Sequence, residues 1–282
     1  MFVRSLKLSL KGVTKRVATA PHLLVLLDFD GTLAPFEADP SAARVSAPAR
    51  EWLNELARCP RATVGIISGR SLADLVARVD LDGLVYAGNY GNEIRGRGLS
   101  FVEPFAFLLE PALKRLLTDL SARLSGFPEV RLEDKRRTAA VHMRGANADE
   151  AARAAAIVWS VVNACPQFRC RRSRDCFDIL PRNGWHKGST VRWIRRELDL
   201  ADALVVYVGD DDSDEDAFSA LPGQITIKVG APPTQASYVA DSPVEVWAFL
   251  ARLTGALASL PQPPSEWYGM VPEHAGAGSV RE

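Results

Sequence analysis

The stretch Leu23-Leu24-Val25-Leu26-Leu27-Asp28-Phe29-Asp30-Gly31-Thr32-Leu33 runs five apolar residues directly into two carboxylates. A short continuous apolar run that stops at polar residues and glycine indicates a strand buried on both faces. In open parallel α/β sheets, ligands bind at the carboxyl ends of the strands, which is where Asp28 and Asp30 are expected. Two carboxylates this close repel each other, so they need a cation or a shared proton. A hard divalent ion such as Mg²⁺, with oxygen ligands, is the natural partner. The alternative is a pair of surface aspartates in an Asp-Gly turn.

A second buried strand is expected over 62–67, one strand–helix unit later, and it ends in Ser68-Gly69-Arg70. A serine hydroxyl beside backbone N–H groups at a strand end can hold a phosphoryl oxygen, although Ser-Gly is also a common turn. Arg70 is a candidate second contact to a substrate anion. Its alternative is a surface salt bridge at the start of a helix over 71–79.

Another buried strand, over 203–209, leads into the most acidic part of the chain, Asp210-Asp211-Asp212-Ser213-Asp214-Glu215-Asp216. Six acids in seven residues at a strand end repel one another strongly unless cations or basic groups offset them. A solvated acidic helix N-terminus is the alternative, but the apolar strand before it favours a metal site. Lys187 stands at the start of a helix expected over 188–198. A cation is unfavourable to the helix dipole there, which favours a functional role.

Between these halves, from about residue 104, the pattern changes to helix, strand, strand, twice over. Helices are expected over 104–124 and 148–164, and each is followed by two short strand-like runs. This order predicts a small α+β lid with an antiparallel sheet, inserted into an α/β core with a parallel sheet. The expected parts are an N-terminal extension at 1–20, the core at 21–103 and 181–260, the lid at 104–180, and a flexible tail at 261–282.

Composition narrows the class of protein. The 282 residues are 47% apolar and 24% charged, as in soluble globular proteins. A net charge of zero, from 34 basic and 34 acidic side chains, argues against a nucleic-acid-coating surface. The four cysteines show no zinc spacing, so buried thiols in a reducing cytoplasm are expected. The spread basic charges of residues 1–20 are typical of a solvated helix, with a membrane-surface anchor as the alternative. No apolar run reaches the roughly 18 residues of a membrane span.

The pattern Asp-x-Asp-Gly-Thr-Leu after an apolar strand resembles the first motif of the haloacid-dehalogenase superfamily of phosphohydrolases. Ser68, Lys187 and Asp210 then stand where the other three motifs of that superfamily follow. The resemblance implies a Rossmann-like core with a C2-type cap, and Mg²⁺ as cofactor. It implies Asp28 as nucleophile, Asp30 as general acid and base, and Ser68 and Lys187 as contacts to the phosphoryl group. The implied metal ligands are Asp28, the Asp30 backbone carbonyl, Asp210 or alternatively Asp211, and Asp214 in a supporting place.

The resemblance narrows to the trehalose-6-phosphate phosphatase family and covers about residues 21–253. The segments that carry it are 86–93, 132–135 with 141–144, 178–181 with 187–188, and 209–215. It implies that four charged residues face the site and hydrogen-bond sugar hydroxyls: Glu133, Lys135, Arg144 and Asp178. Charged side chains that can form two hydrogen bonds at once are well suited to bind the many hydroxyls of a disaccharide. For Glu133 and Lys135 the alternative is an exposed cross-strand charge pair.

Three positions depart from that family's pattern: Tyr90 stands where histidine is usual, Asp178 is one methylene shorter than the usual glutamate, and Leu180 replaces a basic residue. All three belong to the sugar-facing side, so they bear on the identity of the substrate and not on the reaction class. The expectation is Mg²⁺-dependent hydrolysis of trehalose 6-phosphate through an aspartyl-phosphate, with a trehalose-phosphate synthase as candidate partner. The alternatives are a phosphatase or mutase for another sugar phosphate, and a catalytically silent sugar-phosphate sensor.

Overall fold

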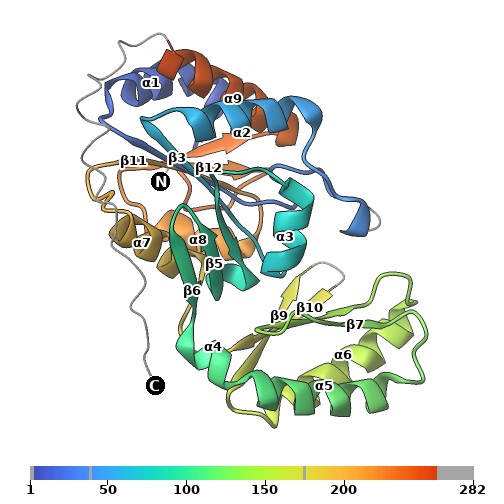
Figure 1. Ribbon diagram of the computed structural model, residues 1–282. Coiled ribbons are helices and arrows are strands. Elements are labelled where there is room, and N and C mark those ends of the chain that lie inside the picture. The colour runs from blue at the N-terminus through green and yellow to red at the C-terminus, as the bar shows by residue number, and fades with distance from the viewer. Residues whose placement is uncertain (1–2, 38–39, 174–175, 259–282) are drawn as a thin grey trace, which may run out of the picture.

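A large mixed sheet forms the centre of the molecule. The computed structural model describes residues 3–37, 40–173 and 176–258 (Figure 1). Within these, the main sheet contains β1 (Arg4–Ser5), β2 (Leu23–Leu27), β3 (Ala62–Ile67), β4 (Val85–Gly88), β5 (Glu93–Gly96), β6 (Leu99–Val102), β11 (Leu204–Gly209), β12 (Ile225–Val229) and β13 (Tyr238–Ala240). Their order is β1-β13-β12-β11-β2-β3-β4-β5-β6. The strands are parallel except for the β4-β5-β6 meander at one edge.

The middle strand, β2, is the point where the winding of the sheet reverses. It pairs in parallel with β3 on one side and with β11 on the other. The chain continues from β2 to β3 and β4, and returns only later to place β11, β12 and β13 on the opposite side. Ligands of open α/β sheets bind in the crevice at such a reversal. Asp28 and Asp210, which follow β2 and β11, therefore lie at the same edge of the sheet.

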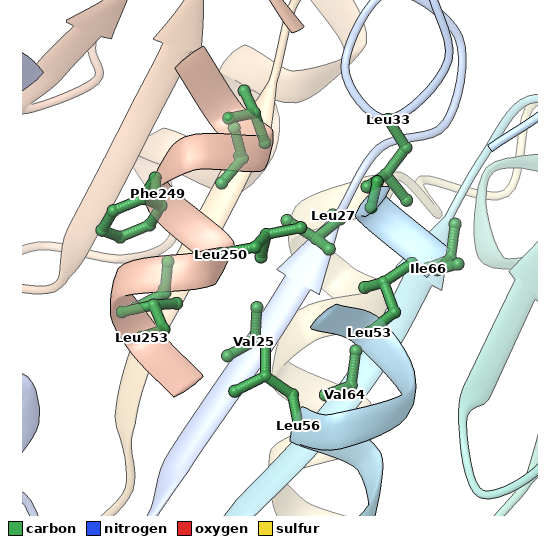
Figure 2. Close-up of a cluster of buried hydrophobic side chains, with 14 of the residues drawn as sticks. Val25, Leu27, Leu33, Leu53, Leu56, Val64, Ile66, Phe249, Leu250 and Leu253 are labelled. Carbon is green, nitrogen blue, oxygen red and sulfur yellow. The ribbon is translucent and has the colours of Figure 1, made fainter. Parts of the chain in front are cut away.

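Helices cover both faces of the main sheet, which explains the unbroken apolar sequence of β2. One face carries α1 (Leu6–Thr19), α2 (Ala47–Arg58), α3 (Leu72–Val79) and α9 (Pro243–Ala258), and the other carries α7 (Lys187–Glu197) and α8 (Asp212–Ser219). Figure 2 shows Val25 and Leu27 of β2 against Leu56 of α2 and Leu250 of α9. The alternate residues, Leu24 and Leu26, pack on the α7 side. A strand buried on both faces was predicted here, and the structure confirms it.

A smaller antiparallel sheet lies beside the core. It contains β7 (Arg131–Asp134), β8 (Ala139–His142), β10 (Cys176–Pro181) and β9 (Phe168–Ser173), in that order across the sheet. Two helices, α5 (Glu110–Leu124) and α6 (Ala148–Asn163), pack on one of its faces. In Figure 1 the strands lie between these helices and the main sheet. The second face of the smaller sheet is thus turned toward the core, as a lid requires.

The helix expected over 104–124 is divided into α4 (Pro104–Leu108) and α5. Pro111 lies in the first turn of α5, where its missing N–H costs no helical hydrogen bond and its fixed φ favours a helix start. A proline inside one continuous helix would instead remove a bond and clash with the preceding turn. The break at Leu109 follows from that preference.

The N-terminal segment differs from the expected solvated helix. Leu6, Val13 and Val17 of α1 are buried in the cluster that also contains α9 residues. The preceding strand β1 pairs in parallel with β13 and extends the main sheet by one strand. The predicted flexible tail at 261–282 lies outside the described residues. Every helix in the described part of the chain is too short or too polar to cross a membrane.

Candidate active site

A buried lysine joins two carboxylates at the centre of the site. Asp28, directly after β2, accepts a hydrogen bond from Lys187 Nζ at 2.6 Å, and Asp214 accepts one from the same atom at 2.7 Å. Tyr207 of β11 donates its hydroxyl to the same Asp214 oxygen at 2.7 Å. Burial opposes the charge on Lys187, but Asp214 and Asp28 outweigh it and raise the pKa of the lysine. The lysine therefore stays a cation beside these two carboxyl groups.

Three carboxylates converge beside this lysine. Asp28, Asp210 and Asp214 each offer an oxygen, and these oxygens lie within 4.8 Å of one another. Burial, with repulsion from Asp214 and Asp211, raises the pKa of Asp210 to about 7. Burial also raises the pKa of Asp28 well above its usual value, and Asp214 and Asp210 add to this against the pull of Lys187. One ammonium facing several buried carboxylates leaves an excess of negative charge. These three residues fit a hard divalent cation such as Mg²⁺, which prefers oxygen ligands.

Two glycines allow these carboxylates to converge. A Cβ atom on Gly209 would lie 2.1 Å from Asp214 Cγ, so only glycine can end β11 here. Gly31 has a φ of +80°, and a Cβ atom there would lie 2.4 Å from Asp210 Oδ2. L-residues with a side chain avoid that φ region. The Asp-Gly and Gly-Asp pairs of the sequence are therefore requirements of the site as well as turn signals.

Asp211 lies outside the three-carboxylate group. Its side chain caps α8 and accepts a hydrogen bond from Ser213 N at 2.8 Å. The Asp210 and Asp211 amides both donate to Asp214 Oδ2, each at 3.1 Å. The start of α8 thus surrounds Asp214. The Asp210 side chain belongs to the three-carboxylate group, whereas the Asp211 side chain caps α8. Of the two alternatives that the sequence left open, the geometry favours Asp210 as a metal ligand.

Asp30 and Arg70 are paired with each other. Arg70 donates from Nε and Nη2 to the two Asp30 carboxylate oxygens, both at 2.7 Å, and from Nη1 to Asp74 at 2.7 Å. Arg70 was predicted to contact a substrate anion. In the structure its guanidinium holds two carboxylates of the protein, those of Asp30 and Asp74. A contact between Arg70 and a substrate anion stays a prediction.

Ser68 stands at the end of β3, next to Asp28. Register pairs Leu27 of β2 with Ile66 of β3, so the two strands end side by side. Ser68 is buried, its amide donates to Ala87 O at 2.9 Å, and its Oγ accepts from Arg70 N at 3.2 Å. These bonds use the hydroxyl as an acceptor, which leaves its O–H available to donate to an anion.

The core-facing side of the smaller sheet gathers three of the predicted sugar-binding residues. Lys135 Nζ donates to Gly69 O at 3.1 Å, and lies 3.8 Å from Asp178 and 3.9 Å from Glu133. Glu133 is also paired with His142 Nε2 at 2.8 Å. Arg144, the fourth predicted residue, is exposed and donates to Glu37 O at 2.9 Å, in the loop that follows β2.

The β7–β8 hairpin tip is fixed to the core by buried polar contacts. Thr138 Oγ1 donates to Asn89 Oδ1 at 2.6 Å, in the short helix η2 (Asn89–Gly91). Arg137 Nε lies 3.3 Å from Glu93 Oε1 at the start of β5. These contacts set where Lys135 meets the Ser68 loop. They connect residues more than 40 positions apart, so no local pattern could reveal them.

Sequence reasoning missed two further residues of the site, Tyr207 and Arg171. Tyr207 occupies a position in a strand buried on both faces, where a polar hydroxyl needs a partner. Arg171 of β9 lies directly opposite Asp178 of β10. The signal was the alternation of arginines at 169 and 171, which places both on one face of the strand.

Known structures share this fold. A haloacid dehalogenase-like hydrolase from Bacteroides thetaiotaomicron matches with a TM-score of 0.58 at 13% identity, over 82% of this chain and 98% of that chain. The C-terminal domain of C. albicans trehalose-6-phosphate phosphatase matches with a TM-score of 0.74 at 20% identity, over 90% of this chain and 98% of that chain. The fold is that of haloacid-dehalogenase-type hydrolases with an α+β cap.

Sequence comparison identifies the family. The family model described as Trehalose-phosphatase matches residues 26–243. Trehalose-phosphate phosphatase from Mycobacterium marinum is 36% identical over 253 residues, which are 86% of this chain and 64% of the relative. The chain thus spans just under two thirds of that relative's length. It belongs to the trehalose-phosphatase family.

Proposed function

We propose that the chain is a phosphatase that hydrolyses trehalose 6-phosphate to trehalose and phosphate. The observation that carries this is the buried Asp28 carboxylate at the end of β2, 2.6 Å from the Lys187 ammonium, in a chain of this family. A carboxylate at the mouth of the sheet reversal is placed to attack phosphorus. A lysine beside it is placed to hold a phosphoryl oxygen at the same time.

The proposed reaction has two displacements at phosphorus. An Asp28 oxygen attacks the phosphorus atom, and the bond between phosphorus and the sugar oxygen breaks while Asp30 gives that oxygen a proton. Water then attacks the phosphorus of the aspartyl-phosphate, Asp30 takes a proton from it, and the bond to Asp28 breaks. Arg70 holds the Asp30 side chain through two 2.7 Å hydrogen bonds. One of these bonds must open before an Asp30 oxygen can carry the proton that it gives or takes.

Charge on the phosphoryl group is offset by donors of the core. Ser68 and Lys187 are placed to donate to its oxygens. Asp28, Asp210 and Asp214 would hold Mg²⁺, which when bound offsets further negative charge on the phosphoryl group. The Asp30 backbone carbonyl stays a prediction as an additional ligand.

The smaller sheet and its helices would act as a cap over this chemistry. We take residues 104–180 as that cap, with Glu133, Lys135 and Asp178 hydrogen-bonding sugar hydroxyls and Arg144 at the rim. Closing the cap would exclude bulk water and complete the pocket. A cytoplasmic location and a trehalose-phosphate synthase partner remain predictions.

The test is phosphate release from trehalose 6-phosphate, with and without Mg²⁺, beside glucose 6-phosphate, sucrose 6-phosphate and p-nitrophenyl phosphate. Asp28→Asn is run in parallel. Mg²⁺-dependent turnover that is selective for trehalose 6-phosphate and lost in the variant supports the proposal. Selective turnover of another ester keeps the mechanism and changes the substrate. Binding of trehalose 6-phosphate without turnover of any ester identifies a silent sensor and contradicts the proposal.

A further inference from the structure

Arg171 of β9 connects the smaller sheet to the phosphate-binding side of the core. Its guanidinium carbon lies 4.5 Å from the ring centroid of Tyr90 in η2. The Tyr90 ring is buried and packs on Gly69: a Cβ atom there would lie 2.5 Å from the tyrosine hydroxyl. The Tyr90 amide also donates to Ser68 O at 2.8 Å. Tyr90 therefore contacts both Arg171 and the Ser68 loop.

The Arg171 guanidinium has an unmet hydrogen-bonding need. Its Nη2 atom is buried and has no hydrogen-bond partner among the described residues. The nearest carboxylate oxygen, on Asp178, is 3.8 Å away, which is too far for a hydrogen bond. A buried donor without an acceptor is costly. The Tyr90 hydroxyl lies close to both groups, yet Nη2 still lacks an acceptor in the described part of the chain. A sugar hydroxyl beside them could accept from the guanidinium and donate to the carboxylate.

The position of Arg171 next to the reacting groups supports such a role. Tyr90, Arg171 and Leu180 line the same small pocket as Lys187, which holds the nucleophile. Asp178 faces Arg171 across β9 and β10, and Leu180 follows Asp178 on the same face of β10. Because position 180 carries no charge, the cationic donor on this wall of the pocket comes from β9.

We propose that Arg171, packed over the Tyr90 ring, is a specificity-determining residue that hydrogen-bonds a hydroxyl of the leaving sugar together with Asp178. This inference rests on the proposed function and deepens it. The group recognised is a neutral, polyhydroxylated leaving group next to the phosphoryl group. The contact with the ring holds the guanidinium at this wall of the pocket. The competing explanation is that Arg171 only fastens the cap to the core.

The test compares two esters that give the same phosphoryl group but differ in the leaving group. Trehalose 6-phosphate offers sugar hydroxyls, whereas p-nitrophenyl phosphate offers none. We expect Arg171→Gln to raise KM for trehalose 6-phosphate about 10-fold or more, because the variant loses one charge-assisted hydrogen bond to the sugar. The kcat and KM for p-nitrophenyl phosphate stay within about twofold, because this ester lacks the contact.

Two further variants sharpen the test. Arg172→Gln is the matched control, since Arg172 is exposed and its guanidinium lies over Phe177, on the other face of β9. We expect it to leave both esters unchanged. Tyr90→Leu should raise KM for the sugar ester as Arg171→Gln does, and the double variant should add little, because the two residues act as one unit. Arg171→Lys keeps the positive charge but lacks the planar guanidinium. Its KM for trehalose 6-phosphate should therefore lie between those of Arg171→Gln and the unsubstituted protein.

Equal losses on both esters in Arg171→Gln and Arg171→Lys would overturn the proposal in favour of a purely structural role. Unchanged kinetics on both would overturn it as well. If the unsubstituted protein hydrolyses no ester, the proposed function fails by itself. Calorimetric binding of trehalose 6-phosphate to the unsubstituted and Arg171→Gln proteins then decides the role of Arg171. Weaker binding only in the variant supports it, and equal binding overturns it.

Discussion

Two buried lysines show how differently the two ends of the site are organised. At the phosphoryl end, Lys187 Nζ lies 2.6 Å from Asp28 and 2.7 Å from Asp214. On the sugar side, Lys135 Nζ lies 3.8 Å from Asp178. Both lysines are almost fully buried, so exposure does not explain the difference. The first makes direct ion pairs, and the second leaves a gap beside its carboxylate.

The contacts of Lys187 form a centre that is organised before a ligand binds. The contacts of Lys135 leave gaps that a ligand could fill. Direct pairs fix the reacting carboxylates before substrate arrives, so little reorganisation is needed during the reaction. Gaps of 3.8 Å around Asp178 leave both Lys135 and Arg171 short of a hydrogen-bond partner there. Hydroxyl oxygens can fill such gaps because each both donates and accepts. We therefore propose that the reaction takes place at the end with direct ion pairs, and that the end with gaps selects the sugar.

The largest effect is expected from Lys187→Met. Turnover of trehalose 6-phosphate and of p-nitrophenyl phosphate should both fall by about 10³-fold, because both pass through the same phosphoryl group. In metal-free buffer the free energy of unfolding should also drop by about 3–5 kcal/mol, since two buried carboxylates lose their cation. Phosphate release and urea unfolding measure the two effects. A loss of turnover with trehalose 6-phosphate but not with p-nitrophenyl phosphate would contradict a role of Lys187 at the phosphoryl group.

Lys135→Met is the matched change on the sugar side, with a smaller and selective effect. KM for trehalose 6-phosphate should rise about 10- to 100-fold, the loss of a charge-assisted contact. Kinetics with p-nitrophenyl phosphate should stay close to those of the unsubstituted protein. Initial rates over a range of both esters provide the measurement. A similar loss on the two substrates would show that Lys135 serves the fold and not the sugar.

The charge excess at the end with direct ion pairs predicts a smaller effect, on stability. The pKa of Asp210 is about 7 in the folded protein, against 3.8 for an unperturbed aspartate. Between about pH 4 and 7 the folded protein holds a proton that the unfolded chain has released. This group therefore makes the metal-free protein less stable as pH rises through that window. Asp210→Asn should remove this pH dependence. The melting temperature of the variant minus that of the unsubstituted protein should therefore increase from pH 5 to pH 7.

Mg²⁺ provides the control for this titration. Ligand carboxylates must be ionised to bind a metal, so added Mg²⁺ should raise the melting temperature more at pH 8 than at pH 5. The Asp210→Asn variant should respond less. A rise of equal size at both pH values, or in both proteins, would argue against a metal site built from Asp210.

Sequence was most informative where one strand and the residue after it define a feature. The apolar run of β2 and the carboxylate at Asp28 follow from local pattern, because burial on both faces leaves no alternation and strand ends carry ligands. The same rule placed Asp210 and Ser68 at that edge. The smaller antiparallel sheet with its helices was predicted from a repeated helix–strand–strand order. Each of these inferences needs only neighbouring residues.

Features that join distant segments could not be predicted in this way. The burial of α1 depends on α9, which lies more than 220 residues further along the chain. The choice between Asp210 and Asp211 depends on which side chain caps α8. The pairing of Arg70 with Asp30 spans 40 residues, and two side chains satisfied by each other look the same in sequence as two that await a ligand.

The central claim is that Asp28 takes the phosphoryl group, and trapping that intermediate tests it most directly. The Asp30→Asn variant should slow the second displacement, because it lacks the base that activates water. This variant is mixed with Mg²⁺ and p-nitrophenyl phosphate, whose leaving group needs no proton from Asp30 in the first displacement. The mixture is quenched in acid and treated with borohydride, which reduces an acyl phosphate to an alcohol. Mass spectrometry should then find homoserine in place of Asp28, and none when Asp28→Asn is added to the same chain. Turnover by the unsubstituted protein with no modification at Asp28, or with modification at another carboxylate, would contradict the account.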